Sequence, residues 1–141
     1  MKNYFFIFIC LISFSVFAND KSANMKLIVK NVKSNNGYIR IALANSKDIY
    51  NSFHDVYIGA SSEIKNGTSE NIFSNIPLGT YAIKVFHDED NDKTLNTNFI
   101  GIPIEDYGFS NNARAVIGIP PWDKAKFELS KDGQEIVIDL N

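Results

Sequence analysis

Apolar and polar residues alternate most clearly in two segments of this 141-residue chain, residues 38–45 and 80–87. The apolar positions are Ile39, Ile41, Leu43, Tyr81, Ile83 and Val85. A period of two places these side chains on one face of a β-strand and the intervening residues on the other. Both segments are therefore predicted to be strands with one buried face.

Shorter segments of strand character surround these two. They cover residues 25–32, 56–64, 70–76, 126–130 and 134–140. A polar cluster ending in Gly37 predicts a hairpin between the first two strands, and Asn66-Gly67 predicts a two-residue turn. Asp132-Gly133 predicts a hairpin between the last two strands. Residues 46–53 do not alternate, and Ser46 is expected to cap a short helical turn there.

About seven short strands without a long helix predict an all-β fold, a single antiparallel β-sandwich of immunoglobulin-like type. Residues 88–112 show little periodicity. A compact domain rarely carries so long a loop unless the loop is functional or hides further strands. We therefore predict that the sandwich presents one long ordered loop as its functional surface.

Residues 1–18 have the pattern of a signal peptide. Lys2 precedes an apolar run over residues 4–17, and Val16 and Ala18 stand at the small-residue positions of a cleavage site. We expect cleavage near Ala18, a β-sandwich domain over residues 19–141, and export to the periplasm or the medium. The alternative is an uncleaved N-terminal anchor.

Composition narrows the classes of partner. Cys10, the single cysteine, would leave with the signal peptide, so no intramolecular disulfide is expected. Without Lys2, 13 of the 14 basic residues remain against 16 acidic ones. This mild acidity argues against a nucleic-acid partner. No second apolar run is long enough to cross a bilayer, so no membrane span is expected after cleavage.

Oxygen-bearing side chains alternate at the start of the 88–112 segment. They are Asp88, Asp90, Asp92, Thr94 and Asn96. Hard cations such as calcium take such ligands from positions 1, 3, 5, 7 and 9 of a loop. Lys93 stands where a calcium loop has glycine, and Phe99 where it has a bidentate glutamate, although Glu89 or Glu105 could substitute if the fold brings them near. The alternative is a solvated turn whose side chains bond their own backbone amides.

Catalysis has less support. His87, Asp88 and Glu105 could serve a small hydrolase, but no partner spacing specifies a catalytic constellation. A histidine at the rim of the core, bonded to a carboxylate or carbonyl group, is the simpler interpretation. We therefore do not expect an enzyme.

The end of the segment is rich in aromatic and amide side chains. With Glu105, the residues singled out here are Tyr107, Phe109, Asn111, Asn112 and Trp122. The aromatic groups could form a platform for a sugar ring or an extended peptide. We favour a role in anchoring the loop to the sheet, because buried apolar surface offsets the entropy lost on ordering.

Residues 87–113, HDEDNDKTLNTNFIGIPIEDYGFSNNA, resemble the signature of the DUF2141 family of exported bacterial proteins, HDENxNGKLDTNFLGIPxEGYGFSNNA. Pro120, Pro121, Ala125 and Phe127 match the later part of that pattern. The resemblance implies no particular activity. The step Leu78-Gly79-Thr80-Tyr81 is similar to one in transthyretin-like and carboxypeptidase-regulatory sandwiches, which agrees with the expected fold.

These observations lead to one main hypothesis and two alternatives. The main one is an exported, non-enzymatic β-sandwich that presents loop 88–112 as a binding surface, stabilised by calcium, to an envelope protein, a peptide or a glycan. The alternatives are a small hydrolase and an envelope structural module without a ligand.

Overall fold

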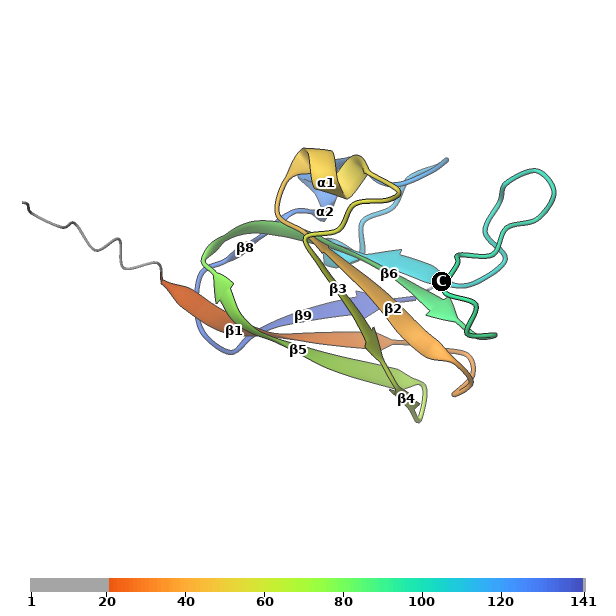
Figure 1. Cartoon of the computed structure of the whole chain (residues 1–141), viewed down its shortest axis with the longest axis horizontal. Coiled ribbons are helices and arrows are strands. Elements are labelled where there is room, and N and C mark those ends of the chain that lie inside the picture. Colours follow the sequence, from red (N-terminus) through yellow and green to blue (C-terminus); the bar gives the residue numbers. More distant parts are fainter. Residues whose placement is uncertain (1–20, 141) are drawn as a thin grey trace, which may run out of the picture.

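The computed structural model describes residues 21–140 and consists of two stacked β-sheets (Figure 1). The expected signal peptide, its cleavage site at Ala18 and Cys10 lie outside the described residues. The strands are β1 (Ser22–Lys30), β2 (Tyr38–Ala44), β3 (Ile58–Ser62), β4 (Ile64–Lys65), β5 (Thr68–Pro77), β6 (Gly79–Asp88), β7 (Tyr107–Phe109), β8 (Phe127–Leu129) and β9 (Gln134–Asp139). The helices are α1 (Lys47–Asn51), the 3-10 turn η1 (Ser110–Asn112) and α2 (Trp122–Ala125).

The first sheet has the strand order β4-β5-β1-β9, and the second has the order β3-β2-β6-β7, with β8 also pairing with β6. The predicted all-β sandwich is confirmed. One pair departs from the antiparallel expectation, because β1 runs parallel to β9. The turn at Asn66-Gly67 joins β4 to β5 in an antiparallel pair, as predicted.

Two predicted hairpins were wrong. Residues 31–37 connect β1 in the first sheet to β2 in the second, and the turn at Asp132-Gly133 connects β8 on β6 to β9 on β1. A turn signal reports that the chain reverses, but the partner of each strand depends on which sheet edges are open. In both cases the two arms pair in different sheets.

The main core lies between the sheets. Its fully buried side chains include Met25, Leu27, Ile39, Leu43, Ile83, Leu129 and Ile138. The period-two positions of β2 and β6 supply much of it, as predicted. Burial of apolar area on this scale is the main source of stability in a domain of this size.

A second, smaller core lies outside the main one and includes Ala44, Tyr50, Ala82 and Ala125. The helices α1 and α2 lie over the second sheet on this side (Figure 1). Ser46 caps α1, as predicted, by accepting a hydrogen bond from the Ile49 backbone at 3.3 Å. The Tyr50 hydroxyl donates to the Pro120 carbonyl at 2.9 Å, and burial raises the pKa of Tyr50 to about 12. Trp122 packs edge-on against the Tyr50 ring at 5.7 Å. Farther along this face, outward side chains of β2 and β6 line a cleft.

Within residues 21–140, no helix combines the length and the apolar character needed to cross a bilayer.

Candidate functional site

The 88–112 segment leaves the end of β6, projects beyond the sheets and returns as β7 (Figure 1). We call residues 88–96 with Glu105 its base, and residues 97–104 its tip. Asp88, the first residue of the base, has no exposed side-chain surface and pairs with Arg40 of β2, whose Nε donates to Asp88 Oδ2 at 2.6 Å. Burial of the Asp88 carboxyl raises its pKa, but the hydrogen bonds from Arg40, Lys93 and Asp92 outweigh burial, so the net pKa lies below the ordinary value.

The chain wraps around the Asp88 carboxylate. Its two oxygens accept hydrogen bonds from the backbone N–H groups of Asp92, at 3.0 Å, and Lys93, at 3.1 Å. The wrapping requires left-handed backbone at Asn91, with φ of 62°, and at Lys93, with φ of 68°. Lys93 thus adopts the conformation for which a calcium loop uses glycine. A lysine in this region is strained by about 1–2 kcal/mol.

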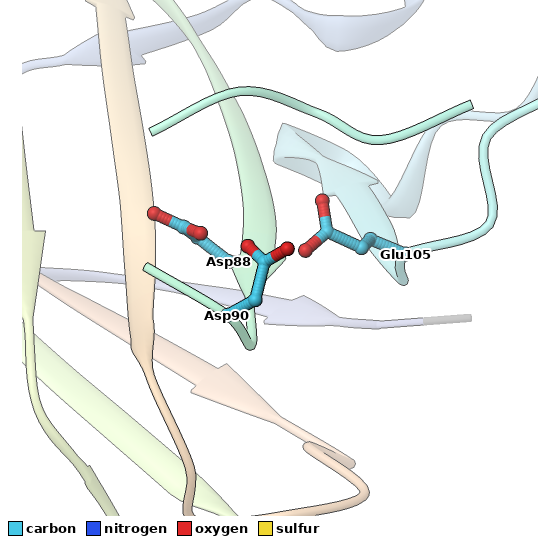
Figure 2. Close-up of side chains that lie close together, drawn as sticks. All are labelled: Asp88, Asp90 and Glu105. Carbon is cyan, nitrogen blue, oxygen red and sulfur yellow. The ribbon is translucent and has the colours of Figure 1, made fainter. Parts of the chain in front are cut away.

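Asp90 and Glu105 join Asp88 in a cluster of three carboxylates. One oxygen of each lies within 4.8 Å of the others. Figure 2 shows the Asp90 and Glu105 carboxylates facing each other, with Asp88 beside Asp90. Glu105 comes from the returning arm, and its oxygens accept from the backbone N–H groups of Glu89, at 3.2 Å, and Asn96, at 2.9 Å. The fold therefore places Glu105 near the cluster, where it can substitute for the glutamate that is missing from position 12 of the loop.

The other predicted metal ligands have local partners. Asp92 accepts from the Thr94 backbone N–H at 2.7 Å, and the Asn96 side-chain amide donates to Asp90 at 3.0 Å. Asp92 does not belong to the carboxylate cluster. These bonds are the ones expected of a turn whose side chains satisfy its own amides. A carboxylate has about four lone-pair sites, so the cluster keeps acceptor capacity for a hard cation.

The three residues of the hydrolase alternative do not converge on one surface, because only Asp88 and Glu105 lie together. His87 and Asp88 are consecutive in β6, so their side chains point to opposite faces of the second sheet. His87 is buried on the core side, where its Nε2 donates to the Asn36 carbonyl at 2.8 Å. A cleft of about 690 Å³ opens on the outer face of the sheet, and none of the three residues lines it.

The returning arm is tied to the sheet by hydrogen bonds and aromatic packing. Asn111 donates to the carbonyls of Lys124 and Lys126, at 3.1 and 2.8 Å, and Asn112 accepts from the Asp139 backbone at 2.8 Å. Phe109 is buried, and Tyr107 meets it edge-on at 5.8 Å. The segment 107–112 thus holds one end of the loop in place.

The tip is ordered but leaves its apolar side chains in solvent. Phe99, Ile100, Ile102 and Ile104 are 99%, 63%, 54% and 68% exposed. The Asn98 side chain accepts from the backbone N–H groups of Ile100 and Ile102, both at 3.0 Å, and Thr97 pairs with Pro103. These exposed side chains were not predicted, although Ile100, Ile102 and Ile104 alternate in the sequence and could have been noticed.

The loop between β1 and β2 supports the base and was also missed. Gly37 has a φ of +69°, and a Cβ there would lie 1.9 Å from the Asp88 carbonyl oxygen. Ser34 donates to Glu89 at 2.6 Å, and Lys33 pairs with Asp106 at 2.7 Å. Contacts between residues roughly fifty to seventy positions apart leave no signal in local spacing.

A sequence model described as "Uncharacterized protein conserved in bacteria (DUF2141)" matches residues 27–137. The chain therefore belongs to the DUF2141 family. The match runs from β1 into β9 and includes the whole 88–112 segment. No match was found among curated proteins or solved structures.

Proposed function

We propose that this protein is an exported, non-enzymatic binding protein that presents the 88–112 loop to a protein of the cell envelope. The observation that carries the proposal is the tip, where four large apolar side chains stand in solvent on an ordered backbone. Large apolar side chains exposed together on one loop are typical of protein-interaction surfaces.

The base supports this role by reducing the cost of binding. A free loop of this length would lose conformational entropy when it docks. Here the Asp88–Arg40 pair and the Glu105 hydrogen bonds hold both arms before any partner arrives. A protein partner fits better than a glycan, because the aromatic rings suited to sugars, Phe109 and Trp122, pack against the small outer core.

Replacing tip residues should abolish the interaction without affecting folding. We expect the double variant Phe99→Ser, Ile102→Ser to lose the envelope proteins that the wild-type protein retains. The exposed pair Val116→Ser, Ile117→Ser is the matched control and should retain them. The measurement is affinity capture from envelope extract with both variants in parallel. The free energy of unfolding should change by less than about 0.5 kcal/mol, because exposed side chains contribute little to stability.

Equal capture by the tip variant and the control would contradict the proposal. The proposal would also be contradicted if every envelope protein captured by the wild-type protein were captured by the tip variant too.

Calcium is the small ligand that we propose for the base. Asp88, Asp90 and Glu105 carry three negative charges, and Arg40 supplies one positive charge in direct contact with the cluster. This excess of carboxylate oxygen favours a hard divalent cation. The ligand set proposed from the structure thus replaces Asp92, Thr94 and Asn96 with Glu105.

Added calcium should raise the thermal midpoint of protein that has been stripped with chelator. A ligand at about ten times its dissociation constant stabilises the native state by about 1.4 kcal/mol, which corresponds to roughly 3–6 °C in a domain of this size. Glu105→Gln should abolish the calcium-induced shift, and Glu135→Gln, on β9, should keep it. The shift is compared within each variant, because Glu105→Gln also weakens the loop. Absence of a shift in the wild-type protein would remove calcium from the proposal.

A further inference from the structure

The cleft on the outer face of the second sheet is lined by none of the three clustered carboxylates and has its own chemistry. Its floor includes Ala42, Lys84 and Phe86, the outward positions of β2 and β6. Val56 of the segment between α1 and β3 and Leu95 of the loop base contribute to its walls. With a volume of about 690 Å³ and mostly apolar walls, it falls within the size range of small-molecule sites.

Lys84 is the distinctive polar group in this cleft. Its Nζ donates to the carbonyls of Tyr50 and Ser52, both at 2.8 Å, and lies 5.5 Å from the centre of the Tyr50 ring. An ammonium has three N–H donors, so one remains for a ligand. Among residues 21–140, no carboxylate lies within 4.0 Å of this nitrogen. Burial lowers the pKa of Lys84, as expected of a cation without a counter-ion.

The other charged groups that line the cleft leave it positive. Arg40 is neutralised by Asp88, and Lys93 is a second cation among the residues that line the cleft. Asp55 is the acidic residue among the described residues that line the cleft, and it accepts a hydrogen bond from Ser52 at 2.9 Å. An anionic group in the cleft would therefore be attracted by Lys84 and Lys93.

We infer that this cleft binds a small amphiphilic carboxylate, with its carboxylate on the free N–H of Lys84 and its apolar body against Val56, Phe86 and Leu95. A charge-assisted hydrogen bond on a partly desolvated ammonium fixes one end of the ligand. The apolar walls bury the other end. The cleft shares Arg40 and Lys93 with the surroundings of Asp88. The inference rests on neither the tip nor calcium, so failure of either proposal above leaves it standing.

The test uses 4-phenylbutyrate as the probe and 4-phenyl-1-butanol as its uncharged counterpart, each titrated into the purified protein and followed by calorimetry and amide chemical shifts. We expect the carboxylate to bind at least tenfold more tightly than the alcohol. Lys84→Met should weaken carboxylate binding about tenfold and leave the alcohol unchanged, because it removes the charged terminal group and keeps an unbranched apolar stem. Lys131→Met, in the turn between β8 and β9, is the matched control and should change neither.

A second variant keeps the test valid if Lys84→Met does not fold. Gly59 lines the cleft from β3, and a Cβ there would lie 3.6 Å from a Val56 methyl group, an ordinary contact. Gly59→Phe should fill the cleft and abolish binding of both probes while Lys84 remains. The inference is overturned if the wild-type protein binds neither probe at about 10 mM, which corresponds to less than about 3 kcal/mol of binding free energy. It is also overturned if Lys84→Met binds the carboxylate as the wild type does, or if the shifted amides lie at the tip.

Discussion

The base and the tip of the 88–112 loop are ordered in different ways, although they belong to one continuous segment. In the base, Asp88 is completely buried and its oxygens accept hydrogen bonds from Arg40, Asp92 and Lys93. In the tip, Phe99 is 99% exposed. In the base, polar side chains hold the backbone through hydrogen bonds. In the tip, the large apolar side chains are exposed and can contact another molecule. A loop can therefore be held firmly at its base and still expose apolar surface at its tip.

The difference has a simple cause in the backbone hydrogen bonds. Every buried N–H or carbonyl group needs a partner, and a long loop has no neighbouring strand to supply them. Asp88 and Glu105 supply acceptors in the base, and Asn98 supplies them in the tip. The tip is also held by the pairing of Thr97 with Pro103 and by its own backbone hydrogen bonds. Because these polar contacts order the tip, no apolar side chain there has to be buried to hold it.

Two glycines with left-handed backbone allow a matched comparison of the two regions. Gly37 lies against the base, where a Cβ would meet the Asp88 carbonyl oxygen at 1.9 Å, whereas a Cβ at Gly101 in the tip would meet nothing within 4 Å. We expect Gly37→Ala to lower the free energy of unfolding by more than about 3 kcal/mol, since steric overlap adds to backbone strain. Gly101→Ala should cost about 1 kcal/mol, from strain alone. Chemical denaturation of both variants provides the measurement.

Similar losses in the two variants would contradict the comparison. A small loss of unfolding free energy for Gly37→Ala would show that residues 31–37 can move away from the base at little cost in free energy.

A smaller effect is expected at Lys93, where the base is strained. Its φ of 68° is left-handed, and glycine accepts this conformation without strain. Lys93→Gly should raise the free energy of unfolding by about 0.5 kcal/mol, because relief of about 1–2 kcal/mol of strain exceeds the entropy cost of glycine. Lys131→Gly is the control, since Lys131 is not among the left-handed residues, and it should lower stability.

A loss of stability in Lys93→Gly comparable to that in Lys131→Gly would show that the lysine side chain contributes more than its backbone strain costs. Urea titrations of both variants at the same protein concentration would distinguish the two cases.

Several features of the fold could be predicted because their physical causes are local. The alternation of Ile39, Ile41 and Leu43 specifies a buried strand face, and Ser46 carries its own capping oxygen. The pairing of β1 with β9, and of β8 with β6, could not be predicted in the same way. Turn residues determine where the chain reverses, but sheet membership depends on edges formed by distant segments.

In the candidate site, too, some features have local causes and others depend on distant contacts. The alternating carboxylates from Asp88 to Asp92 mark an oxygen-rich loop, and this is visible in the sequence. The sequence does not show that Glu105 closes the cluster, that Arg40 neutralises Asp88, or that Gly37 lies against the Asp88 carbonyl group. Each of these depends on a contact across the second sheet or between the two arms of the loop.

The sequence by itself determined the family, the buried faces of the strands, the polar base of the 88–112 loop and the points where the chain turns. These features follow from residue type and the spacing of near neighbours. The tertiary structure alone decided which strands share a sheet, which acids converge and that the tip's isoleucines face solvent. It also decided that Lys84 lines a cleft in which, among residues 21–140, no carboxylate lies within 4.0 Å of its Nζ. The physical reason is that burial and charge pairing are properties of three-dimensional neighbours. In this chain the neighbours that matter most for the 88–112 loop come from β2 and the turn before it, about fifty residues away.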